Sequence, residues 1–356
     1  KAMAKVPFIV HHVVHSAELS WFADILLPST HSNFEQWGYL AQKQDLHMHM
    51  WLARPIDKPF PEAKNPETEY VWLLAEKLAE KGIPNLLDYC KTIVDPETGK
   101  APTNAEEMDL YTTKFRTQPA WDPAKNTTGD KLNGWNDFVE KGVWNSSKYE
   151  YKSKWGNYKT ATKKFEFYSE TLKNNLAKHA AENKTKPGVT IDEVLEACNY
   201  LARGEIAFIP HYEEPVIEGN PAQYPLVFVD HKSRLNREGR SANCSWYQDF
   251  HDVDFGGEKW GDTIKLNPVD AAKLGINHGD TVKVSSPVGS MVVKAFLWEG
   301  IVPGHAVKTY GQGHWNFGKN ASGIGGNNNQ IIPAVYEHLS GSSVYYASTR
   351  VNVTKA

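Results

Sequence analysis

Short stretches of alternating apolar and polar residues dominate the last third of the chain. From Tyr224 onward they are separated by Pro and Gly turns, and a period of two is typical of strands with one buried face. One short helix is expected among them, over residues 269–274. This part, residues 221–356, is predicted to form a compact, mainly β barrel, whose strands would include LVFVD, TVKVSS, SMVVKAF and HAVKTY.

The start of the chain has a different pattern. Residues 6–14 and 25–27 are apolar and β-branched, and residues 16–22 between them can form a short helix that Ser16 would cap. This predicts a strand-helix-strand unit, the tail of an α/β (Rossmann-like) domain over residues 1–60. A domain that starts on its last unit suggests a chain that begins in the middle of a domain.

The middle of the chain, residues 61–220, begins with a clear amphipathic helix over residues 67–81, which ends at Gly82 before Pro84. From 84 to 220 the sequence is aromatic, lysine-rich and irregular, apart from a second amphipathic stretch over residues 192–201. Because its apolar positions are scattered, we expect an irregular α+β segment that wraps another domain instead of forming a core. The predicted fold class is therefore α/β plus mainly-β.

Composition and charge exclude several classes of function. The formal net charge of the 356 residues is −3, with no obviously basic face, so we expect no nucleic-acid partner. No apolar run approaches the ~20 residues that cross a bilayer, so direct membrane insertion is not expected. Cys90, Cys198 and Cys244 lie far apart and form no CxxC pair, which rules out a locally encoded zinc or iron-sulfur motif.

A basic block, HKSRLNREGRSANCSW (residues 231–246), directly follows an apolar strand. Arginine and lysine at a strand end, next to serine and asparagine, can hold a phosphate or a polar heterocycle through charge-assisted hydrogen bonds. The alternative is a solvated basic loop, which is the more usual behaviour of a charge run. The candidate ligand-binding residues are Lys232, Ser233, Arg240, Ser241 and Asn243, with Arg234 and Arg237 beside them.

A second block, YGQGHWNFGKNASGIGGNNNQIIP (residues 310–333), is rich in glycine and asparagine. Glycine permits close backbone approach and positive φ, while asparagine side chains offer both donors and acceptors. Such a loop suits a large polar ligand; the alternative is a flexible connector. Trp315, Phe317 and the flanking apolar strands favour an ordered loop, with Gly313, His314 and Asn328 as candidate ligand contacts.

Six histidines near the start suggest a metal site at first sight: His11, His12, His15, His31, His47 and His49. His47 and His49 would lie on one side of a strand, and His31 could supply a third ligand. No acidic partner stands at helical spacing and HExxH is absent, so a structural role is favoured and no metal ligand is predicted. No GxSxG sequence supports a hydrolase.

Five segments, in a fixed order, together resemble the large subunits of the dimethyl sulfoxide reductase family of molybdopterin oxidoreductases. The similarity is strongest to the branch that reduces arsenate, polysulfide or thiosulfate. GQGHWNFGKNA fits that branch's GxGHxxxGxxA pattern, and the KSxxxxxGR(S/T)A form from Lys232 is similar to respiratory arsenate reductases. Many relatives carry Thr-Gly-Arg where this chain has Asp230-His231-Lys232. Besides GQGHWNFGKNA, the five segments are ADILLPSTHSNFEQWG, TKKFEFYSETLK, LNPVDAAKLGINHGDTVKVSSPVGS and SGSSVYYASTRVNV; the form from Lys232 is a further similarity.

The resemblance implies a respiratory oxidoreductase that binds bis-molybdopterin guanine dinucleotide with molybdenum or tungsten, and a C-terminal double-psi β-barrel that contacts both pterins. It implies three partners: the N-terminal remainder of the subunit with its iron-sulfur cluster and metal-ligating residue, an iron-sulfur electron-transfer subunit and a possible membrane anchor. Location would be periplasmic, or at the outer face of the cytoplasmic membrane. No residue of this chain is expected to be catalytic; the residues expected to bind the cofactor are Lys232, Ser233, Arg240, Ser241, Asn243, Gly313, His314, Asn328 and Arg350.

Two other interpretations remain open. Related folds occur as redox-inert scaffold subunits of electron-transfer complexes that have lost the pterin, since fold alone does not determine function. A scaffold gives no reason to retain GQGHW together with GGNNNQ, and this favours the enzyme. A free-standing ligand-binding barrel from about residue 224 would fold alone, but it would leave the upstream similarities unexplained.

Overall fold

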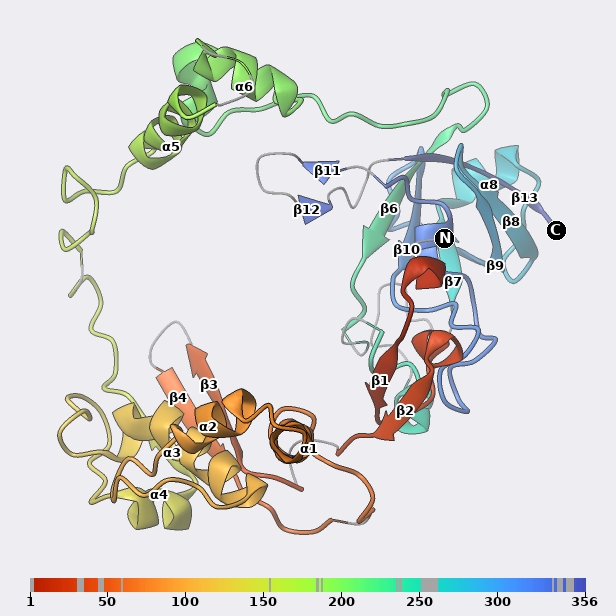
Figure 1. Cartoon of the computed structure of the whole chain (residues 1–356). Coiled ribbons are helices and arrows are strands. Elements are labelled where there is room, and N and C mark those ends of the chain that lie inside the picture. Colours follow the sequence, from red (N-terminus) through yellow and green to blue (C-terminus); the bar gives the residue numbers. More distant parts are fainter. Residues whose placement is uncertain are drawn as a thin grey trace. The chain divides into compact units, whose positions relative to one another are not determined.

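A computed structural model describes most of the chain: residues 3–30, 35–43, 48–58, 60–153, 155–183, 186, 188–234, 236, 239–250, 262–334, 336–337, 342–343 and 349–356. The chain forms two compact units, Lys1–Tyr158 and Lys159–Ala356 (Figure 1). The division at residues 60 and 220 stays a prediction. In the described part of the chain, no helix is long and apolar enough to cross a membrane.

The first unit starts with a parallel pair of strands. After a short 3-10 helix, η1 (Met3–Lys5), β1 (Val10–Val13) pairs with β2 (Ile25–Pro28), and the 3-10 helix η2 (Glu18–Phe22) connects them. The strand-helix-strand prediction is confirmed. The predicted cap is wrong, because Ala17 occupies the N-cap position and its backbone N–H donates to Ser20 Oγ at 3.0 Å.

The rest of this unit combines helices with a small antiparallel sheet. The sheet has the order β3 (Gly38–Lys43), β4 (Met48–Ala53) and β5 (Val143–Asn145). Helix α1 confirms the amphipathic helix predicted near residue 70 and stops before Gly82, whose φ of +82° suits a residue without a side chain. The helices are α1 (Glu69–Glu80), α2 (Asn85–Lys91), α3 (Ala105–Trp121) and α4 (Trp135–Lys141).

The prediction that residues 84–220 lack a core is wrong. Helices α2, α3 and α4 contribute to two buried clusters, one of which contains Trp121, Trp135, Phe138 and Trp144. A third cluster lies in the second unit, where α5 (Glu170–Ala181), α6 (Ile191–Ala197) and the 3-10 helix η3 (Gly204–Phe208) pack together. The buried side of α3 includes polar side chains, so the apolar period is weak there.

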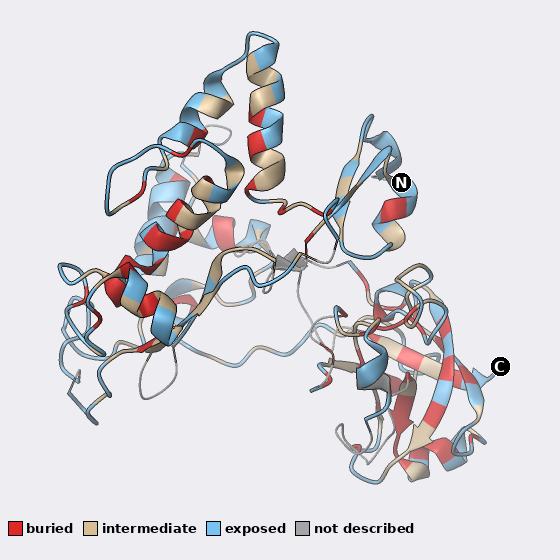
Figure 2. Cartoon of the chain, turned by 90° about the horizontal axis from the view of Figure 1, so that it is seen from below, coloured by how far each residue is buried: buried red, intermediate tan, exposed pale blue. Residues whose placement is uncertain are grey.

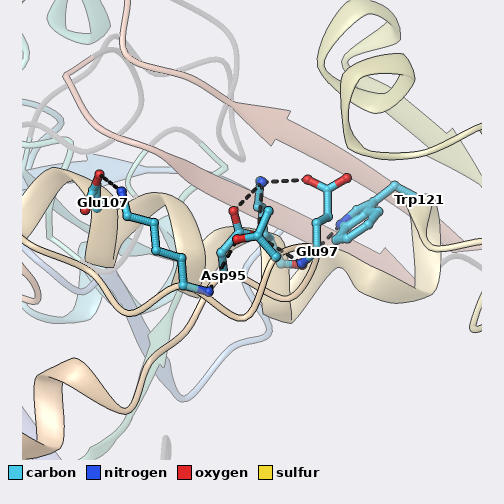
Figure 3. Close-up of polar contacts among 7 residues, drawn as sticks. Asp95, Glu97, Glu107 and Trp121 are labelled. Atoms are coloured by element: carbon cyan, nitrogen blue, oxygen red, sulfur yellow. Dashed lines mark hydrogen bonds and ion pairs between the residues drawn. The ribbon is translucent and has the colours of Figure 1, made fainter.

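A buried lysine explains how a polar face of α3 can be covered. Lys114 Nζ lies 3.1 Å from Asp95 Oδ2 and 2.6 Å from Glu97 Oε2 (Figure 3). Burial alone would lower the pKa of Lys114, but hydrogen bonds to Glu97 and Asp95 raise it above its ordinary value. The Trp121 indole N–H donates to the Lys114 carbonyl at 3.1 Å. These contacts fasten the loop before α3 to the helix.

Six strands of the second unit close into a barrel in the order β10-β6-β13-β8-β9-β7 (Figure 1). Neighbours β6 and β10, and neighbours β7 and β9, are parallel, and the other pairs are antiparallel. The strands are β6 (Leu226–His231), β7 (Thr263–Leu266), β8 (Thr281–Ser285), β9 (Ser290–Leu297), β10 (His305–Thr309) and β13 (Arg350–Lys355).

The barrel encloses a single apolar core, as the buried positions along its strands show (Figure 2). Val282 and Val284 of β8 alternate with exposed residues, as the period of two predicts. The helix predicted over residues 269–274 is α8 (Pro268–Lys273), whereas strand β7 was not predicted. Shorter elements complete the unit: α7 (Ser245–Gln248), η4 (Asn328–Gln330), β11 (Tyr336–Glu337) and β12 (Ser342–Ser343).

Candidate functional site

The two predicted ligand-binding blocks leave the barrel side by side. Strands β6 and β10 are parallel neighbours, with His231 opposite Thr309, so their carboxyl ends lie at the same end of the barrel. The Tyr310 N–H donates to the His231 carbonyl at 3.0 Å, which continues the pairing into the loops. The topology therefore brings together segments that are about 80 residues apart in sequence.

Between these loops lies a cavity of about 480 Å³. Two of the predicted residues, His314 and Asn328, line it. Sequence reasoning missed the others, which are Asp230, Gly239, Tyr310, Gly311, Gln312, Asn327 and Asn329. Asp230 could have been found from its place as the first charged residue of an apolar strand.

Glycines allow the two loops to approach each other closely. A Cβ at Gly311 (φ +81°) would lie 2.6 Å from the Gly239 backbone nitrogen. A Cβ at Gly313 (φ +77°) would lie 2.1 Å from the Asn327 nitrogen. Both positions therefore require glycine for conformation and for space. The cavity owes its shape to backbone atoms that meet at these two residues.

Two buried asparagines present unused acceptors near the cavity. Asn328 is 3% exposed, and its Nδ2 donates to Asp230 Oδ1 at 2.8 Å and to the Thr309 carbonyl at 3.1 Å. Asn236 Nδ2 donates to the Gly311 carbonyl at 2.9 Å. The Oδ1 atoms of both residues are buried and accept no hydrogen bond within the described part of the protein. Such acceptors are expected to have a donor, which a ligand can supply.

The remaining predicted residues lie at different distances from the cavity. Asn243 Oδ1 accepts from the Asn320 N–H at 2.9 Å, which joins the two blocks. Arg240 follows the cavity-lining Gly239 and is exposed, as is Lys232, whereas Ser233 is buried and Ser241 half-buried. Arg350 is not part of the cavity wall: it pairs with Val227, toward the other end of β6 from Asp230.

A buried ion pair supports the floor of this region. Lys308 of β10 is fully buried, and its Nζ pairs with Asp262 Oδ1 while donating to the Thr309 carbonyl at 3.1 Å. Asp262 Oδ2 accepts the Gly326 N–H at 2.5 Å. Since Gly326 directly precedes the cavity-lining Asn327, the pair connects strand β10 with the glycine-rich loop.

Burial raises the pKa of Asp230 to about 6, while the Asn328 hydrogen bond, Lys308 and the His231 amide act in the opposite direction. The folded protein thus holds this proton up to about pH 6, whereas the unfolded chain loses it near the ordinary value of 3.8. We expect the free energy of unfolding to fall as pH rises through this window, and Asp230→Asn to remove that slope. Urea denaturation at several pH values measures it.

Asp280 provides the matched control, because the Asn277 amide and Lys355 lower the pKa of its carboxyl. Its contribution has the opposite sign and is lost as pH falls. In addition, Asn328→Leu removes a donor to the Asp230 carboxylate and is expected to raise the Asp230 pKa further, as observed by carboxyl ¹³C NMR. An Asp230 that titrates near 4 in both proteins would contradict this account.

Three of the early histidines have ordinary packing or hydrogen-bonding contacts. His11 Nδ1 lies 3.2 Å from Ser20 Oγ, the His12 ring lies 4.6 Å from that of Tyr70, and His49 Nδ1 lies 2.6 Å from Asn145 Oδ1. His31 and His47 fall outside the described residues. Among the residues that are described, no three His, Cys, Asp or Glu side chains form a group that could hold a metal ion.

Comparison with known proteins identifies this region. The family described as "Molydopterin dinucleotide binding domain" matches residues 242–349. The arsenate respiratory reductase molybdopterin-containing subunits of Chrysiogenes arsenatis and Shewanella are 49% and 46% identical over the whole chain. The chain covers 43% and 42% of their lengths, so it spans less than half of these relatives.

The fold agrees with this similarity. Acetylene hydratase from Pelobacter acetylenicus superposes with a TM-score of 0.57 at 14% identity, over 99% of this chain and 41% of that one. At this identity the likeness concerns the fold alone. Together with the near-half identity to the two arsenate respiratory reductase subunits, the matched dinucleotide-binding domain shows that the chain belongs to the dimethyl sulfoxide reductase family of molybdopterin oxidoreductases.

Proposed function

We propose that this chain is part of the large subunit of a respiratory arsenate reductase and that its barrel helps to bind a molybdopterin guanine dinucleotide. One observation carries the proposal: the glycine- and asparagine-rich loop that lines the cavity, with the buried, unused amide acceptor of Asn328, lies within the residues matched by the dinucleotide-binding family. Arsenate is the oxyanion named for both relatives that align with the whole chain. Molybdenum or tungsten would be the metal.

The residues present fit a pterin or guanine ring system. Such rings carry amide and amino N–H donors on their edges, which match the Oδ1 atoms of Asn236 and Asn328. Gly311 and Gly313 allow the close approach of the loops that border the cavity a flat ring would enter. Asp230, whose pKa is raised to about 6, is a further acceptor or, when protonated, a donor in the same wall.

The other proposed contacts differ in chemistry. Lys232 and Arg240 are exposed cations that suit the phosphates of a dinucleotide, and Ser233, Ser241 and Asn243 are polar groups beside them. His314 lines the cavity, with its ring 4.7 Å from that of Phe317, and we assign it a contact with the cofactor. Arg350 is assigned on the family resemblance alone.

Two finer statements about the fold are part of the proposal. The barrel has two parallel pairs, β6 with β10 and β7 with β9, among antiparallel neighbours, and this supports a double-psi barrel. The parallel pair β1 and β2, joined through η2, supports the assignment of residues 1–60 to a Rossmann-like α/β domain.

The bound cofactor would supply two-electron redox chemistry at its metal. The residues of this chain bind and orient it: the asparagines fix the ring edges, the cations neutralise phosphate charge, and the close-packed loops exclude water. Electrons would pass through iron-sulfur clusters, in the N-terminal remainder of the subunit and in an electron-transfer subunit. A membrane anchor and a periplasmic location complete the proposal.

Replacing Arg240 by alanine is expected to weaken cofactor binding about tenfold or more, because a charge-assisted contact to phosphate is worth about 1.5–3 kcal/mol. The barrel should keep its stability, since Arg240 is exposed. The measurement is the amount of molybdenum, tungsten and released guanine nucleotide bound per mole of the complete subunit that contains this chain. The matched control is Arg116→Ala, which removes an exposed arginine from α3.

The substrate is tested by measuring the rates at which the same preparations reduce arsenate, selenate and thiosulfate. We expect arsenate to be reduced in preference, with activity proportional to cofactor content across the variants. Equal cofactor content in the Arg240 and Arg116 variants would contradict the phosphate assignment. A complete subunit that carries neither metal nor guanine nucleotide would identify a redox-inert scaffold instead.

A further inference from the structure

The first unit contains an acidic cavity of about 400 Å³ that the proposed function does not use. Its wall includes five carboxylates, and the base that lines it, Lys58, already pairs with Glu69 at 2.8 Å. Like charges that share a cavity repel one another, and a cation placed among them would relieve this repulsion. The carboxylates belong to Glu35, Asp57, Glu69, Glu106 and Asp109.

Asp109 of α3 is the carboxylate of this cavity whose charged form is disfavoured by burial. Its Oδ2 accepts the Trp37 backbone N–H at 2.9 Å. Burial raises the pKa of Asp109 to about 7, against that hydrogen bond, and the charges of Glu69, Glu67 and Glu106 raise it further. A positively charged group beside Asp109 would therefore gain both an ion pair and a hydrogen-bond acceptor.

A second, independent feature points to a bound donor. Thr68 also lines this cavity and is 7% exposed, yet its buried Oγ1 has no hydrogen-bond partner among the described residues. Thr68 is the N-cap residue of α1 but makes no side-chain capping bond. A buried hydroxyl without a partner is costly, so an external donor is expected at this position.

The arrangement favours an organic cation over a metal ion. No group of three His, Cys, Asp or Glu in the described residues is arranged to hold a metal. A guanidinium carries several N–H donors in a fixed plane and can serve a carboxylate and a hydroxyl together. A primary ammonium group has the same charge but fewer donors.

A neighbouring cavity indicates which kind of molecule bears the cationic group. This cavity, of about 630 Å³, shares Glu35 and Asp57 with the acidic one and is otherwise lined mainly by apolar residues such as Val13, Val14 and Phe60. Phe60 is 67% exposed, and Ile56, in the wall of the acidic cavity, is 73% exposed. A free cation would leave these side chains uncovered, whereas a polypeptide can cover them.

We propose that the two cavities together form a docking site for a polypeptide segment in which an arginine or lysine is followed by an apolar residue. The basic side chain enters the acidic cavity, near Asp109 and Thr68. The apolar side chain covers Phe60 in the neighbouring cavity. Charge complementarity sets the position of the segment and apolar burial adds affinity.

The test uses the whole 356-residue chain, labelled with ¹⁵N at tryptophan, at a pH of about 8, where Asp109 is ionised. N-acetyl-arginyl-leucine amide is the probe, and the Trp37 amide, assigned through a Trp37→Phe variant, is the reporter. We expect a saturable shift of this resonance. The neutral citrulline analogue should bind about tenfold or more weakly, as expected for loss of a charged hydrogen bond.

The variants locate the site. Asp109→Asn and Thr68→Val should each weaken binding of the arginine probe, and Asp109→Asn should have the larger effect. If the Asp109 variant does not fold, Thr68→Val alone tests the site. Glu140→Gln removes an exposed carboxylate of α4 and should leave binding unchanged. N-acetyl-arginine amide, which carries the same single charge but lacks the leucine, should bind more weakly than the dipeptide. Equal affinity would overturn the polypeptide assignment, and an unshifted Trp37 amide with every probe would overturn the site.

Discussion

Alanine at Gly313 is expected to destabilise the barrel by about 3–5 kcal/mol, which combines the ~1–2 kcal/mol cost of a left-handed conformation with the cost of overpacking. The added Cβ would lie 2.1 Å from the Asn327 nitrogen and 2.2 Å from the Gly326 carbonyl carbon. Because both neighbours are backbone atoms, the loop itself must move. Native-state hydrogen exchange of the β8 and β9 amides measures the loss, and cofactor content of the complete subunit should fall with it.

Gly275 is the matched control for conformation. Its φ of +66° resembles that of Gly313, but a Cβ there meets nothing within 4 Å. Gly275→Ala should therefore lose only about 1–2 kcal/mol, the conformational part alone. If the two alanine variants lost the same stability, the close approach of the loops at Gly313 would be wrong.

Replacing Lys308 by methionine is expected to cost about 3–5 kcal/mol, since the substitution removes one partner of a buried ion pair and leaves the other charge buried. Of the two Asp262 contacts described above, only the hydrogen bond from the Gly326 N–H would remain. The loop that follows Gly326 should loosen, so cofactor retention should fall as well. Urea denaturation of the whole chain, followed by hydrogen exchange at barrel amides, gives the change in free energy of unfolding.

The matched control is Lys283→Met, which replaces an exposed lysine of β8 with the same side chain. Surface substitutions of this kind usually change stability by less than about 0.5 kcal/mol. Because a buried carboxylate that has lost its lysine partner is protonated more easily, the Lys308 variant should recover part of its stability as pH falls. Equal stability of the Lys308 and Lys283 variants would show that the buried pair contributes nothing to this barrel.

The barrel could be predicted from sequence because its strands have one buried and one exposed face. Val282, Val284 and Val293 follow that period, and the turns between the strands contain Gly or Pro. Strand β7 escaped prediction because Ile264, Lys265 and Leu266 are buried in succession, so its pattern does not alternate. Helix α3 escaped because Lys114 and Thr117 lie on its buried side, where hydrogen bonds replace apolar contacts.

The candidate site shows a similar division. Gly313 and Asn328 could be predicted from the composition of their loop, since glycine and asparagine have distinctive conformational and hydrogen-bonding roles. Asp230 could be noticed only as the first charged residue of an apolar strand, and Asn236 not at all, because their roles depend on contacts with Asn328 and Gly311, about 75–98 residues away. Pairing of β6 with β10 creates those contacts. The register of two strands that are distant in sequence cannot be predicted from the residues of either strand alone.

Closure of the barrel also determines where this chain is vulnerable to self-association. Each barrel strand pairs on both sides, so the barrel presents no open edge to another molecule. Strands β1 and β2 pair only with each other among the described strands, and Val10, Ile25 and Leu26 on them are exposed. The pair β1 and β2 therefore offers an open, partly apolar edge to another molecule, and charged substitutions at these exposed positions should improve the solubility of the isolated chain.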